Sequence, residues 1–225
     1  MSVRTVARQT AIDTAVLLGA ALVLVALFSL VGNAVKHGSP GTESRLMRHL
    51  DAGPAAITTK ISKALSVVGS QGVLVPIVIS ACVLLAMRGV ARTAVAVAVS
   101  AAGGIALSNI VKLIVNRPRP GLVHLVHVTS SSFPSGHATQ AAAILPALAL
   151  AVVALGVPRT AAFVVTGLAA IAIGVSRVLL GVHYPSDVIA GWLLGGTWFA
   201  LTYLVLINRS AGRGRRSGPA AAPGR

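Results

Sequence analysis

Six intervals without a charged side chain constrain the fold of this chain more than any other feature. Each is close to the roughly 20 residues that a membrane-spanning helix needs. The intervals are Thr14 to Val35, Ala64 to Met87, Thr93 to Val111, Ala138 to Pro158, Thr160 to Ser176 and Val188 to Asn208. Hydrophobic residues make up 55% of the chain and charged residues only 10%, which is more apolar than a soluble domain requires. We therefore predict an all-α fold, a six-transmembrane-helix bundle forming one domain over residues 1–208.

The first two intervals each allow a second interpretation. Arg4 and Arg8 precede the first apolar run as basic residues precede a secretory signal peptide, but the length of the run and the lack of an Ala-x-Ala site favour an uncleaved span. The second interval is interrupted by the run from Gly69 to Gly72, which leaves Val73 to Met87 as its strongest part. Thr58 to Val68 is then an interfacial helix that leads into it.

The formal charge of +15 raises the question of a nucleic-acid partner. The basic residues are spread over every predicted loop, aromatic residues make up only 4% of the chain, and no nucleic-acid-binding motif is present. We therefore expect no nucleic acid, and assign most of these cations to contact with membrane lipids at the headgroup level. Residues 209–225 are rich in Gly, Pro, Ala and Arg without an apolar period, so we expect a disordered cytoplasmic tail.

An even number of spans puts both termini on one side of the membrane, and the Arg-rich tail favours the cytoplasm for that side. The segments from Lys112 to His137 and from Arg177 to Asp187 follow the third and fifth spans, so they emerge together on the opposite face. Polar groups at the ends of membrane helices are candidate functional residues. We therefore predict an integral, multi-pass protein of the cell membrane with an outward-facing site and both termini cytoplasmic.

The first segment reads KLIVNRPRP, with Lys112 near the end of the third helix and Arg119 seven residues later. Two cations at this spacing can converge on one anion. The alternative is that Lys112 simply reaches toward the headgroups at the end of its helix. Arg117 forms a second Arg-Pro pair, which makes the functional arginine ambiguous on this segment alone.

The second segment reads SSSFPSGHATQ, and its Ser135, Gly136 and His137 lead directly into the fourth span. A turn at Gly136 followed by a helix N-terminus offers N–H groups and a positive dipole end to an oxyanion. His137 stands at the same helix entrance, where it can protonate a leaving oxygen. The alternative is an ordinary loop-to-helix transition with Ser135 as the N-cap.

The third segment contains the only carboxylate after Asp51, which is Asp187, four residues after His183. Pro185 suits the first turn of a helix, which would bring the histidine and the acid together. A carboxylate on one ring nitrogen leaves the other nitrogen as a nucleophile or base. Arg177 ends the preceding span. The alternative is a structural His-Asp hydrogen bond that fixes the loop.

Together the segments give Lys-x6-Arg-Pro, Pro-Ser-Gly-His and Ser-Arg-x5-His-x3-Asp, in that order and on one face of the bundle. This combination resembles the type 2 phosphatidic acid phosphatase superfamily, the lipid phosphate phosphatases related to vanadium haloperoxidases. The match is complete at every motif position between Lys112 and Asp187. The first 111 residues carry no motif and agree with the family only in the number of spans.

The resemblance implies a catalytic role for each motif residue. It makes His183 the nucleophile that forms a phosphohistidine, Asp187 the residue that orients it, and His137 the acid that protonates the leaving alkoxide. Phosphate oxygens would be bound by a further set of residues, namely Lys112, Arg119, Arg177, Ser135 and Gly136. Similar family members need no metal or other cofactor, and we expect none here.

Two other features carry no predicted chemistry. His124 and His127 have the spacing of a metal pair but no third ligand nearby, so we interpret them as loop residues. Cys82 lies in mid-span and is interpreted as a packing residue.

The expected substrate is a lipid phosphate monoester or diphosphate, and family resemblance suggests phosphatidic acid, phosphatidylglycerophosphate or a polyprenyl diphosphate such as undecaprenyl diphosphate. The same site would serve a lipid phosphotransferase. A haloperoxidase is disfavoured because those proteins are soluble. A small six-span transporter is disfavoured because no charged side chain lies inside the predicted spans, where a transported ion would need one. The sequence leaves the oligomeric state open.

Overall fold

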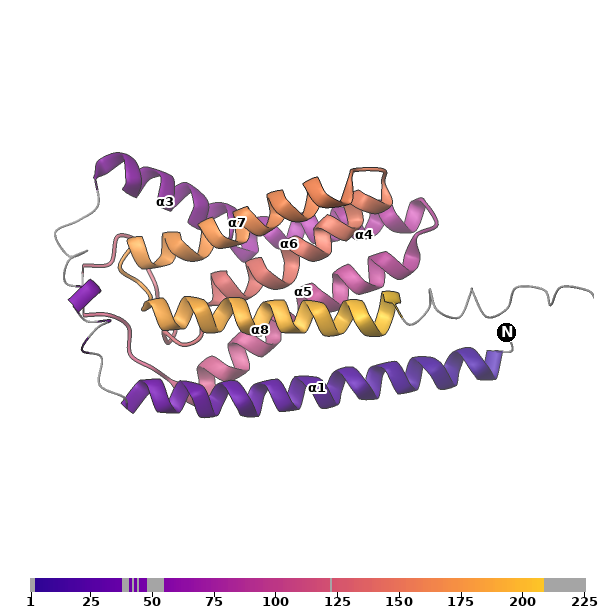
Figure 1. The fold of residues 1–225 in the computed structure, drawn as a ribbon, viewed down its shortest axis with the longest axis horizontal. Helices are drawn as coiled ribbons and strands as arrows, with labels where there is room; N and C mark the ends of the chain where they lie inside the picture. The colour runs from indigo at the N-terminus through magenta and orange to yellow at the C-terminus, as the bar shows by residue number, and fades with distance from the viewer. Residues whose placement is uncertain are drawn as a thin grey trace, which may run out of the picture.

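The computed structural model describes residues 3–37, 41, 43, 45–47, 55–121 and 123–208. Over these residues it is an all-helical bundle without strands (Figure 1). The helices are α1 (Val3–His37), α3 (Ala56–Val68), α4 (Gln71–Met87), α5 (Ala91–Val115), α6 (Gly136–Ala154), α7 (Arg159–Leu179) and α8 (Pro185–Tyr203), which ends in a π-helical turn, η1 (Leu204–Asn208). The tail predicted over residues 209–225 lies outside the described residues.

The predicted all-helical membrane bundle is confirmed, with five or six candidate spans among the described residues. Five helices, α1, α5, α6, α7 and α8, are long and apolar enough to cross a membrane, and α3 with α4 makes a sixth if the bent pair counts as one span. Their outward faces carry large apolar side chains, such as Leu22 and Leu113, which are 72% and 82% exposed. Such faces suit a lipid environment, because there is no water to avoid. The chain is therefore an integral membrane protein.

The break in the second span comes at Gly69 and Ser70, where α3 and α4 meet at an angle of 44°. A Cβ atom at Gly69 would lie 2.5 Å from Ile173 Cγ2, so the absent side chain lets the end of α3 approach α7. The interruption read from the sequence is therefore real. It places α3 against α7 near the end of the bundle that carries the polar loops of the sequence.

Helix α6 occupies the middle of the bundle, between α5, α7 and α8 (Figure 1). Its close contact with α8 depends on two glycines one helical turn apart. A Cβ atom at Gly191 would lie 2.8 Å from the carbonyl oxygen of Ser135, and one at Gly195 would lie 2.1 Å from that of Thr139. Small residues four apart allow helix backbones to approach closely in membranes. Here they hold the start of α8 against the start of α6.

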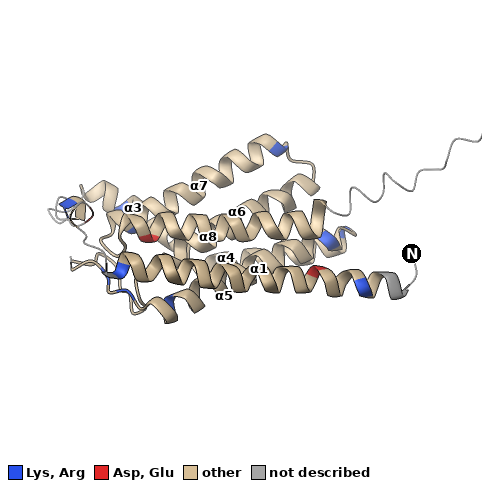
Figure 2. Ribbon diagram, turned by 60° about the horizontal axis from the view of Figure 1, so that its bottom comes forward, with Lys and Arg blue, Asp and Glu red and all other residues tan. Residues whose placement is uncertain are grey.

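The polar loops meet at one end of the bundle. Helix α1 begins and α8 ends at the other end (Figure 1). The segments that follow α5 and α7 therefore emerge on the same face, as the order of the spans predicts. Lys and Arg residues gather near the two ends and leave the middle of the helices free of them (Figure 2).

Candidate functional site

A pocket of about 270 Å³ opens where the three sequence segments converge. Six of the eight predicted site residues line it: Lys112, Arg119, Gly136, His137, Arg177 and His183. The remaining wall is formed by Gln71, Asn109, Val128, Thr129, Ser130 and Gln140. Ser135 and Asp187 lie behind this surface and are fully buried. The pocket thus combines three cations and two histidines without a lining carboxylate.

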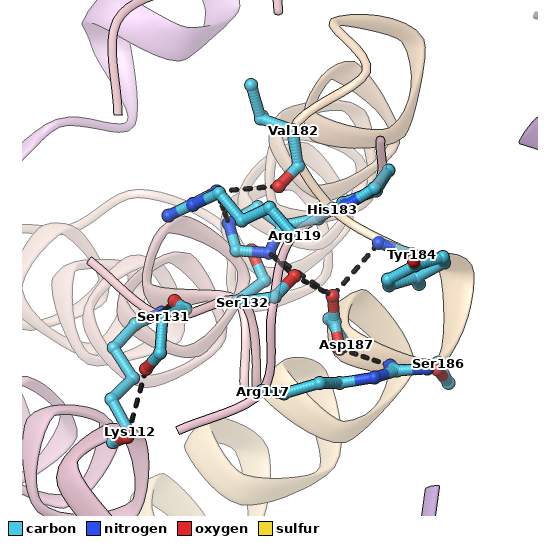
Figure 3. A network of polar contacts seen from close by, with 12 residues as sticks. Lys112, Arg117, Arg119, Ser131, Ser132, Val182, His183, Tyr184, Ser186 and Asp187 are labelled. Atoms are coloured by element: carbon cyan, nitrogen blue, oxygen red, sulfur yellow. Dashed lines mark hydrogen bonds and ion pairs between the residues drawn. The ribbon is translucent and has the colours of Figure 1, made fainter. Parts of the chain in front are cut away.

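His183 is held against Asp187 at the start of α8. Its Nδ1 lies 3.5 Å from Asp187 Oδ2, and Pro185 occupies the first turn of the helix, as predicted. Asp187 Oδ2 also accepts hydrogen bonds from the backbone N–H of Tyr184, at 2.9 Å, and from the hydroxyl of Ser132 (Figure 3). The carboxylate is therefore fixed on the Nδ1 side of the ring, which leaves Nε2 to the pocket.

Burial determines the protonation state of His183, whose side chain is 2% exposed. Loss of hydration, together with the nearby cations Lys112 and Arg119, lowers the pKa of His183 to about 3 against the opposing effect of Asp187. The imidazole is therefore neutral at neutral pH. A neutral ring has a lone pair available for attack, which a nucleophile needs.

Arg119 ties the two polar loops to each other. Its Nε donates to the carbonyl oxygen of Ser130 at 2.7 Å, and its Nη1 donates to that of Val182 at 2.6 Å (Figure 3). The same Nη1 lies 3.3 Å from His183 Nε2. A guanidinium group at this place can contact a phosphate that His183 approaches.

Lys112 lies in the last turn of α5, where the sequence places it, and is 8% exposed. Its Nζ donates to the carbonyl oxygen of Ser131 at 2.5 Å, while the Ser131 hydroxyl donates back to the Lys112 carbonyl at 2.9 Å. This reciprocal pair aims the ammonium group at the pocket instead of along the helix axis. The Lys112 side chain therefore does not simply extend toward the headgroups.

Arg177 and His137 share a partner that the sequence did not single out, Ser66 of α3. Arg177 Nη1 donates to the Ser66 hydroxyl, and His137 Nε2 donates to the Ser66 carbonyl oxygen at 3.1 Å. The Nε of Arg177 is buried and has no hydrogen-bond partner among the described residues. A buried guanidinium nitrogen without a partner is suited to an anionic ligand.

The turn before α6 presents a helix N-terminus to the pocket through Gly136. Ser135 is the N-cap residue, but its side chain makes no capping hydrogen bond and its hydroxyl has no partner among the described residues. Its backbone N–H donates to the Asp187 carbonyl oxygen at 2.9 Å, which joins this turn to α8. The first N–H groups of a helix have no intrahelical partners and favour an anion.

A second carboxylate, Glu43, joins the site from the segment after α1. Arg117 lies between it and Asp187, with Nη1 2.6 Å from Asp187 Oδ1 and Nη2 3.3 Å from Glu43 Oε2. Ser186 donates its backbone N–H to Glu43 Oε1 at 2.7 Å. Asp187 is thus isolated in the sequence but not in space. No sequence signal marks Glu43 or Ser66, whereas Arg117 was visible as the second Arg-Pro pair.

The described residues contain no group of three or more His, Cys, Asp or Glu side chains arranged to hold a metal ion. His124 donates from Nε2 to the Pro120 carbonyl oxygen at 3.0 Å, in the loop outside the pocket. His127 is exposed in the same loop. Neither histidine lines the pocket.

Comparison with known proteins adds three findings. The family model described as the PAP2 superfamily matches residues 93–211, more than half of the chain. Phosphatidylglycerophosphatase B of Bacillus subtilis is 38% identical over 99 residues, which are 42% of this chain and 49% of that protein. The lipid A 1-phosphatase of Rhizobium etli is 39% identical over 114 residues, 46% of this chain and 45% of that protein. The chain spans about half the length of these curated relatives.

The fold also matches a solved structure, the crystal structure of a transmembrane PAP2 type phosphatidylglycerolphosphate phosphatase from Bacillus subtilis. The TM-score is 0.72 at 24% identity, and the match covers 87% of this chain and 96% of that one. At this identity the likeness concerns the arrangement of the helices.

Proposed function

Because the chain belongs to the PAP2 superfamily, we propose that it is a lipid phosphate phosphatase, which hydrolyses a lipid phosphate monoester or diphosphate through a phosphohistidine. One observation carries the proposal. A buried, neutral His183 faces a pocket lined by three cations, at one end of a membrane bundle. A phosphate ester brings negative charge that these cations match, and its lipid can remain in the membrane.

Lys112, Arg119 and Arg177 bind the phosphate oxygens of the substrate, and the first N–H groups of α6 are additional donors. Charge spreads over the phosphoryl oxygens during transfer, so fixed cations around them stabilise the transition state. The unpartnered Arg177 Nε supports this assignment. Ser135 contributes through the turn that carries Gly136, since its own hydroxyl is buried behind the pocket.

In the first chemical step His183 Nε2 attacks phosphorus in line with the leaving oxygen. The new N–P bond forms as the ester P–O bond breaks, and His137 in its protonated form gives a proton to the departing alkoxide. Asp187 holds the ring through Nδ1 and stabilises the positive charge that develops on it. In the second step water attacks phosphorus, His137 takes a proton from that water, and the N–P bond breaks to release phosphate and neutral His183.

The proposed location is the cell membrane, with the site facing outward and both termini in the cytoplasm. The start of α1 and the end of α8 at the end opposite the pocket support a common side for the termini (Figure 1). The positive-inside tendency then assigns that side to the cytoplasm. A tag at residue 225 that is accessible from outside intact cells would contradict this orientation.

The test of the function is phosphate release by the purified full-length protein in detergent. Phosphatidic acid, phosphatidylglycerophosphate and a polyprenyl diphosphate serve as the substrate panel, each with and without an acceptor lipid. We expect inorganic phosphate as the product of at least one substrate. If the phosphoryl group passes to the acceptor lipid without release of phosphate, the protein is a phosphotransferase.

A further inference from the structure

We propose that the pocket has a second, uncharged part formed by Gln71, Asn109 and Gln140. It binds hydroxyl or ester oxygens beside the phosphate, so the substrate is the phosphate monoester of a lipid with an oxygen-rich headgroup such as glycerol or a sugar. This inference rests on the proposed function and narrows its substrate class. All three carboxamide residues line the same pocket as the cations.

This uncharged part of the pocket lies on the membrane side of the phosphate-binding groups. Asn109 precedes Lys112 by three residues on α5, which runs toward the site, and Gln140 follows His137 by three residues on α6, which leaves it. At a rise of 1.5 Å per residue the Asn109 and Gln140 carboxamides are set about 4.5 Å farther along the bundle axis, away from this end, than Lys112 and His137. The leaving group of a lipid substrate extends in that direction.

Gln140 supplies the strongest evidence for a ligand at this level. The residue is 5% exposed, and its carboxamide makes no hydrogen bond to any described residue. Its Nε2 lies 3.8 Å from the position of a Cβ atom on Gly136, directly beside the phosphate-binding turn. A carboxamide that opens into the pocket at this place can donate to, and accept from, the oxygen groups of a ligand whose phosphate lies beside it.

The distribution of charge in the pocket argues against a diphosphate substrate. The pocket contains three cations, Lys112, Arg119 and Arg177, and Arg119 Nη1 lies 3.3 Å from His183 Nε2. The residues farther in are neutral, so a second phosphate there would lose its hydration without a cationic partner. A bare polyisoprenyl chain is also unsuited, because it would cover the carboxamides with hydrocarbon.

The experiment compares substrates within one protein preparation, so that the fraction of folded protein cancels. The purified full-length protein, Gln140→Met and Asn109→Leu are assayed in one detergent with phosphatidic acid, a polyprenyl monophosphate and a polyprenyl diphosphate. Asn33→Leu, an exposed position on α1 outside the pocket, is the matched control. We expect each pocket variant to lower kcat/KM for phosphatidic acid about three- to tenfold, the effect of one lost neutral hydrogen bond. The polyprenyl monophosphate should change less than twofold.

The outcomes separate this inference from the function on which it rests. An equal loss with both monophosphates, or faster hydrolysis of the polyprenyl diphosphate by the unmodified protein, overturns the inference and leaves the phosphatase intact. If the unmodified protein releases phosphate from none of the three, the proposed function itself fails, and the inference with it.

A separate network, outside the pocket, leads us to infer that Arg117 is a positioning residue for Asp187. The guanidinium is 6% exposed and lies 4.2 Å from the centre of the Tyr184 ring. Besides its ion pairs with Asp187 and Glu43, it donates from Nη1 to the Ser186 hydroxyl at 2.9 Å (Figure 3). It does not line the pocket, so it acts through Asp187 and not on the substrate.

The geometry explains why this cation is needed. Asp187 Oδ2 receives the contacts that serve His183, while Oδ1 is fixed by Arg117. Glu43 also accepts a hydrogen bond at the entrance of α8, through Ser186, so two carboxylates share one helix N-terminus. Their mutual repulsion is offset by the guanidinium between them. Without it Oδ1 would lose its hydrogen-bond donor and the carboxylate would lose its counter-ion, which leaves the position of Asp187 to the contacts of Oδ2 alone.

The test uses Arg117→Met and Arg117→Lys, with Arg88→Met as a control at an exposed position in another loop. We expect Arg117→Met to lower kcat about a hundredfold, as displacement of a catalytic group does, with KM changed less than twofold. Arg117→Lys should restore part of kcat, because it returns a positive charge without the planar fork. A rise in KM with unchanged kcat would overturn the inference by making Arg117 a phosphate ligand. Equal loss in the Lys and Met variants would overturn it as well.

Discussion

His183 Nδ1 lies 3.5 Å from Asp187 Oδ2, and both side chains are buried where α8 begins. The proline at the first position of α8 and the four-residue spacing bring the two groups together within a single turn. The other end of the imidazole faces the pocket and its cations. This arrangement fixes Nδ1 on the carboxylate and leaves Nε2 directed to the pocket.

Replacement of the nucleophile should abolish turnover. We expect His183→Ala to lower phosphate release at least about a thousandfold, because no other described group is placed to form the covalent intermediate. His124→Ala, in the loop outside the pocket, should retain full activity. Release of inorganic phosphate from the best lipid substrate measures both. Full activity of His183→Ala would refute the mechanism.

The midpoint of the acid limb of the pH profile should lie well below the ordinary pKa of a histidine. Catalysis needs the neutral form of His183, which is present above its pKa. Since burial lowers the pKa of His183 to about 3, the neutral form persists as the pH falls through 6.5. The measurement is kcat/KM between pH 4 and 8, corrected for ionisation of the substrate phosphate. A midpoint near 6.5 that remains after this correction would contradict a neutral resting His183.

Chelation should leave the rate unchanged. Lys112, Arg119 and Arg177 supply the positive charge that a phosphate needs, and the family resemblance implies chemistry without a metal. We expect phosphate release in excess EDTA to equal that in buffer, and added Mg²⁺ not to stimulate it. Loss of activity in EDTA that Mg²⁺ restores would show that a metal takes part.

Arg177 should not tolerate a lysine. The guanidinium reaches Ser66 through Nη1 and keeps Nε free for the substrate, and one ammonium group cannot do both. We expect Arg177→Lys to lower kcat/KM about ten- to a hundredfold through loss of charge-assisted hydrogen bonds. Arg159→Lys, at the exposed start of the same helix, is the matched control. Equal kinetics for the two variants would exclude a specific role for the Arg177 guanidinium.

The contact between α6 and α8 should depend on one glycine and not on its neighbour. A Cβ atom at Gly195 would lie 2.1 Å from the Thr139 carbonyl oxygen, whereas one at Gly196 would meet nothing within 4 Å. We expect Gly195→Ala to destabilise the protein by about 1–3 kcal/mol, as overpacking does, and Gly196→Ala to be neutral or slightly stabilising. Thermal unfolding in detergent compares them. Equal midpoints would show that the helices are not in this close contact.

The sequence by itself determined the membrane bundle, since the charge-free intervals need lipid and their order places two polar loops on one face. It also predicted the start of α8 at Pro185 and the position of Lys112 in the last turn of its helix, because these depend on local signals of spacing and capping. The break at Gly69 was visible as an interruption of an apolar run, although its packing against Ile173 was not.

Only the tertiary structure decided which distant groups complete the site. Glu43 is far from Ser186 in the chain, and Ser66 is far from Arg177, so neither pair leaves a pattern of spacing. These contacts exist because α3 packs on α7 and because Glu43 lies against the start of α8. Local rules specify each helix and its ends, whereas partners from separate helices are chosen by packing between them.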